Sequence, residues 1–396
     1  MKNWINATIG DLCKVIAGQS PQSKYYNTDG VGLPFYQGKK EFGDKFISTP
    51  QKWTTKITKE AEPGDILMSV RAPVGPINFA IEKICIGRGL AAIRAGQKID
   101  RNFLFYGLLS KQDEIKGTEG AVFASINQTQ IKNIKFAYPP LSEQQRIVEI
   151  LDKTFEGIDR AIANTEKNLA NARELFESYL NAIFTQKGDD WVEKKLGDVC
   201  HNVEYGTSSK SQAQGKIPVL RMGNVKNGVI DWTDLVYTSD QNEIDKYYLK
   251  YDDVLFNRTN SEEHVGKTAI YKGEYPAIFA GYLIRINYKK ELLDADFLNF
   301  YLNSNSAREY SKFVMTRSVN QANINGTKLK GYPISIPSIK TQQEITKKLY
   351  SLRFETQRLE AIYQRKLEAL QELKQSILHK AFTGELTNPT VKEDAA

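Results

Sequence analysis

Two stretches of the chain carry apolar residues at the spacing of a long amphipathic helix. From Ile147 to Ile183, apolar or small residues recur in alternating steps of three and four, and a slightly looser version of this pattern runs from Ile345 to Ala381. Such steps form the heptad seam of a helix that packs against a second helix. Each stretch therefore predicts a helix of about 40 residues, roughly 60 Å long.

The two helical stretches belong to a longer internal repeat. Residues 126–185 align without a gap on residues 324–383, with 18 identical residues in 60 positions, whereas chance would give about 4. The residues between the repeated parts differ, so two modules of one architecture are expected to perform one kind of task on two different targets. A second anchor aligns residues 4–13 with residues 191–200 and includes Trp4 and Trp191, Gly10 and Gly197, and Cys13 and Cys200.

The first helix has a recognisable start. Pro139 and Pro140 disfavour helix, and Ser142 with Gln145 three residues later has the spacing of a capping box. The first helix is therefore expected to begin near Leu141 to Glu143.

The second helix lacks this box, because Lys340 replaces the serine and Ser338 or Thr341 must cap the helix instead. The matched lengths and seams favour packing of the two helices against each other. The pair would be antiparallel, since a folded segment separates the helices in sequence. Packing of each helix on its own globular segment is the alternative.

The rest of the chain reads as short strands between turns. The clearest apolar runs are residues 66–68, 84–86, 90–93, 254–256 and 282–286. Together these patterns predict an α+β protein, with two mixed α/β heads in a pseudo-twofold tandem repeat and two long helices that form an antiparallel coiled coil. The expected segments are a first head at 1–140, a helical spacer at 141–187, a second head at 188–338, a second spacer at 339–386 and a disordered polar tail at 387–396.

Composition narrows the class of protein. Hydrophobic residues make up 41% and charged residues 26%, which is typical of a globular chain, and no apolar run approaches the roughly 20 residues of a membrane span. The N-terminus lacks the apolar core of a secretory signal, so we expect a cytoplasmic protein without a membrane. The three cysteines show no Cys-x-x-Cys spacing, which predicts reduced thiols rather than a disulfide or zinc site. Cys13 and Cys200 are expected to be small core residues.

The charge is unevenly distributed. The net charge is +7, with 19 basic and 12 acidic residues in residues 1–140 but 19 of each in residues 188–338. A basic excess permits contact with nucleic acid. A similar surface on the second head would require segregation of its charges onto one face.

Motifs for catalysis are missing from the sequence. It has neither a phosphate-binding loop nor a methyltransferase cofactor loop. Ala137-Tyr138-Pro139-Pro140 inverts the order of an amino-methyltransferase motif, and the acidic residues at 189–193 are close together in a linker. His201, His264 and His379 are scattered, so neither a nucleophile with its base nor a metal site is indicated.

Two variable heads, each followed by a nearly duplicated helix, resemble the specificity subunits of type I restriction-modification systems. The resemblance covers essentially the whole chain and is most specific at Ile126-Asn127 and in the run from Tyr138 to Ile147. Residues 18–21 and 32–38 are also similar to stretches of the family's first recognition domain. The second copy departs from the pattern with Pro337-Ser338 in place of Pro-Pro, which leaves equal packing at the two helix starts open.

The resemblance implies a DNA-recognition protein with no catalytic centre of its own. Each head would read one half of a bipartite site in double-stranded DNA, and the helices would set the spacing. Two modification subunits would methylate adenine with S-adenosylmethionine, and restriction subunits would supply ATP- and Mg²⁺-dependent translocation and cleavage. This chain is therefore expected to bind no cofactor and no metal itself. A coiled-coil scaffold without DNA affinity, or an enzyme with an unrecognised active site, are the competing readings.

Side-chain chemistry in polar, turn-rich stretches indicates candidate DNA contacts. Arginine suits guanine, asparagine and glutamine suit adenine, and lysine and serine suit phosphates. The alternative for each residue is an ordinary solvated or structural role. The candidates are Gln19, Ser20, Gln37, Lys39, Lys40, Arg71 and Arg88 in the first head, and Arg221, Asn224, Arg258, Asn260, Arg317 and Asn320 in the second.

Overall fold

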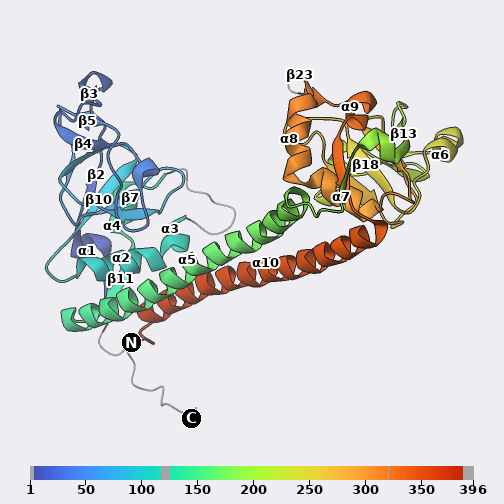
Figure 1. Ribbon diagram of the computed structural model, residues 1–396. Coiled ribbons are helices and arrows are strands. Elements are labelled where there is room, and N and C mark those ends of the chain that lie inside the picture. Colours follow the sequence, from blue (N-terminus) through green and yellow to red (C-terminus); the bar gives the residue numbers. More distant parts are fainter. Residues whose placement is uncertain (1–3, 117–124, 320, 387–396) are drawn as a thin grey trace, which may run out of the picture. The chain divides into compact units, whose positions relative to one another are not determined.

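The computed structural model describes residues 4–116, 125–319 and 321–386 (Figure 1). The predicted tail at 387–396 and the candidate Asn320 lie outside the described residues. The chain divides into two compact units, one formed by residues 1–165 with 365–396 and the other by residues 166–364. Each unit therefore contains one head and part of both long helices, so the units cut across the segments expected from the sequence. Within the described ranges, no helix combines the length and apolarity needed to cross a membrane.

The first head has a strand whose two faces pack in two different hydrophobic cores. In β7 (Ile66–Ser69), Ile66 and Met68 pack in the core that includes helix α2 (Arg101–Ser110), whereas Leu67 packs toward a second sheet. Successive side chains of a strand point to opposite faces, so a continuous apolar run suits a strand that is covered on both sides. The predicted runs at 66–68, 84–86 and 90–93 are all strands, as expected.

The elements of the first head form three sheets. The four-stranded sheet has the order β2 (Cys13–Ala17), β10 (Leu90–Ala95), β7 and β8 (Ile77–Phe79). The five-stranded sheet has the order β3 (Tyr26–Asn27), β5 (Trp53–Thr54), β4 (Leu33–Tyr36), β9 (Ile84–Ile86) and β6 (Glu60–Ala61). A two-stranded sheet pairs β1 (Ile5–Thr8) with β11 (Lys135–Tyr138). The remaining helices are α1 (Ile9–Leu12), η1 (Ser23–Tyr25), η2 (Lys39–Glu41), α3 (Gln112–Lys116) and α4 (Gln128–Lys132).

The second head repeats this plan with a longer central sheet. In β18 (Asp253–Asn257), Val254 and Phe256 face the core that includes α7 (Ala295–Asn303), whereas Leu255 faces another core, as Leu67 does in the first head. The six-stranded sheet has the order β13 (Cys200–Tyr205), β22 (Leu283–Tyr288), β18, β20 (Thr268–Tyr271), β16 (Gly228–Ile230) and β15 (Val225–Lys226).

Smaller elements complete the second head. Two three-stranded sheets have the orders β17 (Val236–Thr238), β14 (Ile217–Leu220), β21 (Ile278–Phe279), and β19 (Thr259–Asn260), β24 (Gln321–Asn323), β23 (Thr316–Ser318). A two-stranded sheet pairs β12 (Val192–Lys195) with β25 (Pro333–Ile336). The helices are η3 (Leu196–Val199), η4 (Met222–Asn224), α6 (Gln241–Tyr247), α8 (Asn305–Val314) and α9 (Gly326–Lys330).

The repeat found in the sequence has the same surroundings in both heads. A Cβ on Gly10 would lie 3.1 Å from Lys132 Cβ, and a Cβ on Gly197 would lie 3.1 Å from Lys330 Cβ. Asp11 Oδ2 accepts a hydrogen bond from the N–H three residues before it, as does Asp198 Oδ2. The anchors of the sequence alignment are therefore equivalent positions of one frame. All three cysteines are free thiols, and Cys200 is buried while Cys13 is half-buried.

The two long helices are α5 (Leu141–Thr185) and α10 (Ile339–Phe382), and they lie side by side (Figure 1). In the first unit, Lys374 Nζ lies 2.6 Å from Asp159 Oδ1. In the second, Arg173 Nε lies 3.2 Å from Glu360 Oε2. In the same unit, Arg353 of α10 lies over the ring of Phe176 of α5, 4.8 Å from its centroid. A later residue of α5 thus meets an earlier residue of α10, so the expected antiparallel pairing is found within this unit.

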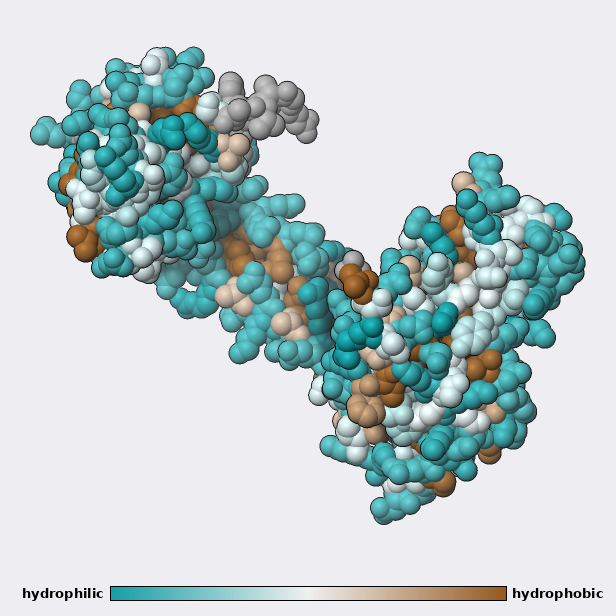
Figure 2. Space-filling view, turned by 90° about the horizontal axis from the view of Figure 1, so that it is seen from above, coloured by the Kyte–Doolittle hydropathy of each residue, from teal (hydrophilic) through white to brown (hydrophobic). Residues whose placement is uncertain are grey.

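Helix α5 begins at Leu141, as expected, but its capping residue and the seam of α10 differ from expectation. The Pro140 carbonyl accepts the N–H groups of Glu143 and Gln144, so Ser142 lies inside the first turn and the capping-box prediction is wrong. At α10, Ser338 Oγ accepts the N–H of Thr341, which confirms Ser338 as the cap. The seam of α5 is largely buried, but in α10 the side chains of Leu359 and Leu373 are exposed. Figure 2 shows such hydrophobic side chains at the surface of the helical part of the chain.

Candidate nucleic-acid interface

Three loops of the first head meet and bring four of the predicted residues together. One loop follows β2, one follows β4, and the third connects β9 to β10. Ser20 Oγ donates a hydrogen bond to Gln37 Oε1 at 3.2 Å, and the N–H of Arg88 donates to Ser20 Oγ at 3.1 Å. Gln19 joins them because its N–H donates to Ile86 O at 2.9 Å.

The close approach of these loops depends on glycine. A Cβ on Gly18 would lie 2.1 Å from Gly87 O, and a Cβ on Gly89 would lie 2.5 Å from Gln37 O. No real Cβ tolerates such distances to a backbone oxygen, so only glycine fits at either position. Gly18 and Gly89 therefore hold the polar loop side chains at one place on the surface.

The other candidates of the first head lie beside these loops. Lys39 and Lys40 belong to the short helix η2, which begins two residues after Gln37. Lys39 is exposed, and Lys40 Nζ donates to Gln51 Oε1 at 2.8 Å. Arg71 is exposed, and the residue before it donates its N–H to Gly89 O at 2.9 Å. All seven candidates of the first head thus belong to one connected group of loops.

Sequence reasoning missed a group of lysines over tyrosine rings at the edge of the five-stranded sheet, which also contains β4. Lys24 and Lys56 lie 5.2 Å from the ring centroid of Tyr25, and Lys52 lies 5.9 Å from that of Tyr26. Basic and aromatic side chains together suit the phosphates and bases of nucleic acid. The adjacent Lys-Tyr-Tyr at 24–26 was the available signal.

In the second head, two predicted residues line a cavity of about 710 Å³. Arg221 follows β14 and Asn260 belongs to β19, and they share the cavity with Lys226, Lys267 and His264, which were not predicted. Lys267 Nζ lies 2.6 Å from His264 Nδ1, and burial together with nearby Arg308 lowers the pKa of Lys267. Basic and amide groups of this kind are those that contact phosphates and base edges.

Arg221 is held by its neighbours but keeps free donors. Its Nη2 donates to Asp234 O at 2.8 Å and to Asp234 Oδ2 at 3.1 Å. Its Nε is buried without a partner, as are Arg258 Nε and Asn257 Oδ1. Asn257 is tied to the cavity wall, since its Nδ2 donates to Met222 O at 3.2 Å. Unpaired buried polar atoms are rare in native proteins, and of these three residues Arg221 lines the cavity.

Other candidates of the second head have structural surroundings. Asn224 is buried, and its Nδ2 donates to Asp231 O and Thr233 O at 2.9 and 3.0 Å, so this amide fastens a loop and is not available to DNA. Arg258 lies over the ring of Tyr205, 5.0 Å from its centroid, and donates to Gly281 O at 3.2 Å.

Arg317 is exposed in β23, with its Nε 3.1 Å from Glu262 Oε2. It does not line the cavity that contains Arg221 and Asn260. The structure thus brings together two of the described candidates of the second head, and separates the others from that cavity.

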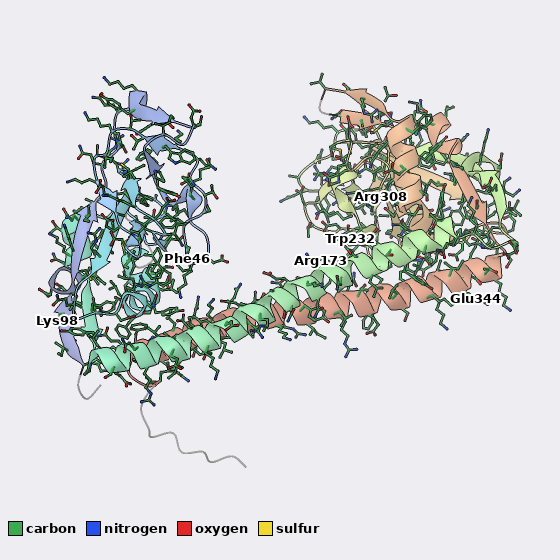
Figure 3. All side chains as sticks on the ribbon, turned by 60° about the vertical axis from the view of Figure 1, so that its left-hand side comes forward. Phe46, Lys98, Arg173, Trp232, Arg308 and Glu344 are labelled. Atoms are coloured by element: carbon green, nitrogen blue, oxygen red, sulfur yellow. The ribbon has the colours of Figure 1, made fainter. Side chains whose placement is uncertain are left out.

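A smaller cavity of about 440 Å³ lies in the second unit where α5, α8 and α10 meet. Arg173, Arg308 and Arg353 line it, and Figure 3 labels the first two. The Arg353 guanidinium lies between the rings of Phe176 and Phe300, 4.8 and 4.7 Å from their centroids. Glu177 and Glu360 also line this cavity, so its charge is mixed and it suits DNA less well.

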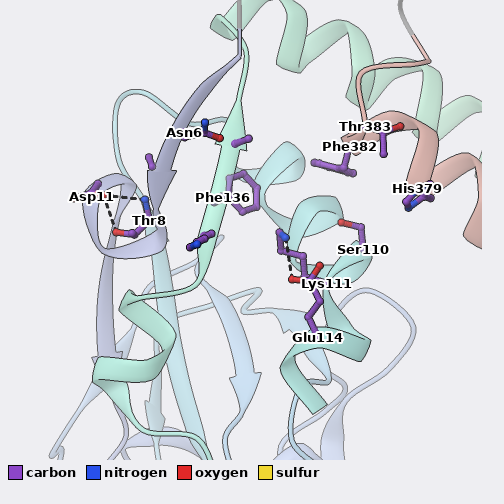
Figure 4. A pocket seen from close by; sticks show the side chains of 13 residues that line it. Asn6, Thr8, Asp11, Ser110, Lys111, Glu114, Phe136, His379, Phe382 and Thr383 are labelled. Carbon is purple, nitrogen blue, oxygen red and sulfur yellow. Dashed lines mark hydrogen bonds and ion pairs between the residues drawn. The ribbon is translucent and has the colours of Figure 1, made fainter. Parts of the chain in front are cut away.

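A third cavity, of about 800 Å³, contains no predicted DNA contact (Figure 4). It lies in the first unit beside β1, β11 and the end of α10. Three of its charged groups have local partners: Thr8 Oγ1 donates to Asp11 Oδ2 at 2.7 Å, which lowers the pKa of Asp11, and Lys111 pairs with Glu114 at 3.1 Å. Nothing in it resembles a nucleic-acid site. Among the described residues there is also no group of three or more metal-ligating side chains.

Comparison with known proteins places the chain in a family. The family of type I restriction modification DNA specificity domains matches residues 1–170 and 188–369. The EcoKI specificity subunit of Escherichia coli K12 is 28% identical over 98% of this chain and 90% of its own length. The MjaX specificity subunit of Methanocaldococcus jannaschii is 41% identical over 190 residues, so that alignment spans 47% of this chain and 44% of that protein.

A solved structure shares the fold. It comes from work on complex assembly and conformational transition of the type I R-M system, has a TM-score of 0.79 at 18% identity, and covers 98% of this chain and 99% of that one. The resemblance seen in the sequence is therefore confirmed. The chain belongs to the family of type I restriction-modification specificity subunits, which recognise DNA and carry no catalytic centre.

Proposed function

We propose that this chain reads a bipartite DNA site, with one short word contacted by each head and an unread gap between the words. The observation that carries the proposal is the repetition of one frame with different loops. Gly10 and Gly197 have matching surroundings, whereas the loops after β4 and β14 present different side chains. A head of this size can contact only a few base pairs, so two heads give two words.

The long helices would set the gap between the words. Helix α5 connects the two heads along the chain and α10 follows the second head, so the length of this helix pair would limit how far apart the two half-sites can lie. Insertion or removal of whole helical turns should change the number of unread base pairs without changing either word.

Two modification subunits and the restriction subunits are the proposed protein partners. In the second unit, Leu175 and Tyr179 of α5 and Phe354 and Ile362 of α10 are exposed. Exposed apolar residues along a helix pair suit contact with another protein. S-adenosylmethionine, ATP and Mg²⁺ are assigned to these partners, which would methylate adenine and drive restriction.

Methylation sequencing of host DNA tests the proposal. With this gene and its partner genes present, methyladenine should occur in a motif of two short words around a fixed gap, and deletion of this gene should remove that motif. An unchanged pattern of methylation, with the partner subunits expressed, would contradict DNA recognition and favour a scaffold.

A further inference from the structure

One position in the loops after β4 and β14 has the same backbone surroundings in both heads but carries a different side chain. In the first head, β4 pairs in parallel with β9, with Tyr36 opposite Ile86. In the second, β14 pairs in parallel with β21, with Leu220 opposite Phe279. The residues that follow Tyr36 and Leu220 are Gln37 and Arg221.

The surrounding backbone confirms this equivalence. The N–H of Gly87 donates to Tyr36 O at 2.8 Å, and the N–H of Ala280 donates to Leu220 O at 2.9 Å. The carbonyl of the residue before each donor also accepts an N–H from the loop after the first strand of the central sheet. Gln19 donates to Ile86 O in the first head and Thr207 donates to Phe279 O in the second, at 2.9 Å in both. The backbone hydrogen bonds around this position are thus the same in both heads, and only the side chain at the position differs.

Gln37 offers the hydrogen-bonding groups that adenine requires. It is exposed, and its Oε1 accepts from Ser20 Oγ at 3.2 Å, which holds the amide in place. Its Nε2 has no partner within the described part of the chain, and an amide oxygen retains a second lone pair. An amide of this kind can donate to adenine N7 and accept from adenine N6.

Arg221 offers donors only, which suits guanine. Asp234 holds its Nη2 by two hydrogen bonds, and Nη1 has no partner among residues that the structure describes. The guanidinium lines the 710 Å³ cavity, where Lys267 supplies further positive charge. Guanine presents two acceptors, O6 and N7, in the major groove, and a preoriented arginine is the commonest side chain that reads them.

We propose that this shared position determines one base of each word, Gln37 reading an adenine with the first head and Arg221 reading a guanine with the second. The inference rests on the proposed function, because it requires each head to read a word. It assigns a base-reading role to two residues that occupy equivalent backbone positions and carry different side chains.

The test is methylation sequencing with the complete enzyme in its host. Arg221→Gln should relax or change one guanine position of the second word and leave the first word intact, and Gln37→Arg should change one adenine position of the first word alone. Discrimination at the affected position should fall by about 5- to 140-fold, which corresponds to the loss of one specific base contact. Arg160→Gln removes the same charge from the exposed surface of α5 and should change neither word.

A second variant separates base reading from phosphate binding. Arg221→Lys keeps the positive charge but loses the planar guanidinium that Asp234 orients, so it should relax the same guanine position. Wild-type recognition of the second word by Arg221→Lys or by Arg221→Gln would overturn the inference.

If methylation falls at every site, binding of the purified complex to duplexes with single base-pair changes decides the matter. A loss confined to the guanine position supports base reading, and an equal loss for every duplex overturns it. Absence of any bipartite motif with the unaltered chain would instead contradict the proposed function itself.

Discussion

Gln144 and Gln342 are buried in the two units and make the same three hydrogen bonds. Each Oε1 accepts from the N–H of the aspartate that caps a helix of its head, at 2.7 Å from Asp100 and 2.8 Å from Asp294. Each Nε2 donates to the proline carbonyl before its own long helix, at 2.8 and 2.9 Å, and to a carbonyl two residues before the capping aspartate. This glutamine therefore fastens each head to the start of its long helix.

Replacement of Gln144 by alanine should destabilise the first unit. The change leaves one buried N–H and two carbonyls without partners, which should lower the free energy of unfolding by about 3 kcal/mol. Gln145 is the next residue and is exposed, so Gln145→Ala should change it by less than about 0.5 kcal/mol. Urea unfolding followed by circular dichroism measures both. Equal midpoints for the two variants would show that the buried bonds contribute nothing.

The fold could be predicted from sequence where the signal was local. The seams from Ile147 and Ile345 gave both helices, and the apolar runs gave the central strands, because spacing along one element is enough to show which residues it buries. The burial of Gln144 was not predicted, because its partner Asp100 lies 44 residues earlier in the chain. A glutamine in a first helical turn has no local pattern that distinguishes a buried side chain from a solvated one.

The candidate site was predictable in part for the same reason. The four loop residues that meet in the first head are polar and lie within two residues of a glycine, and the glycines marked the turns. In the second head, Asn224 has the same local appearance but points inward to fasten its own loop. Lys226, His264 and Lys267 were missed because the fold, and not the spacing, brings them beside Arg221.

Lys39 should contact a phosphate rather than a base. It is exposed beside Gln37, and a lysine is a point charge that suits the DNA backbone. Lys39→Gln should weaken binding of the complete enzyme to specific and nonspecific duplexes alike, and should reduce the slope of log K against log salt by about 1. Fluorescence anisotropy across a salt series measures this, with Lys153→Gln on α5 as the control. A loss limited to one DNA sequence would show that Lys39 reads a base.

Phe354 should be part of the surface that binds a modification subunit. Its side chain is 66% exposed on α10, so Phe354→Glu should alter stability by less than about 0.5 kcal/mol. Burial of a carboxylate against an apolar partner is costly, so the variant should fail to copurify with the modification subunit. Val31→Glu adds the same charge at an exposed apolar residue of a head loop and should leave assembly intact. Full stoichiometry of the Phe354→Glu complex would place the partner elsewhere.

Cys13 and Cys200 should be unreactive in the folded chain. They occupy equivalent positions, and burial raises the pKa of each thiol to about 12. The thiolate is the reactive form, so iodoacetamide at pH 8 should modify neither residue until urea unfolds the chain. Mass spectrometry of tryptic peptides measures the modification. Rapid labelling of Cys200 in the folded chain would mean that its environment is neither apolar nor closed.

The same raised pKa values predict how stability depends on alkaline pH. In the folded chain Cys200 keeps its proton up to about pH 12, whereas in the unfolded chain it loses the proton near its ordinary pKa of 9. Between these values the unfolded state binds fewer protons, so the free energy of unfolding should fall by about 1.4 kcal/mol per pH unit for this thiol. Below pH 9 both states are protonated and the contribution is constant. Urea unfolding of the native chain and of Cys200→Ala from pH 8 to pH 11 should therefore give a shallower alkaline decline for the variant, and parallel curves would show that this thiol does not titrate differently in the two states.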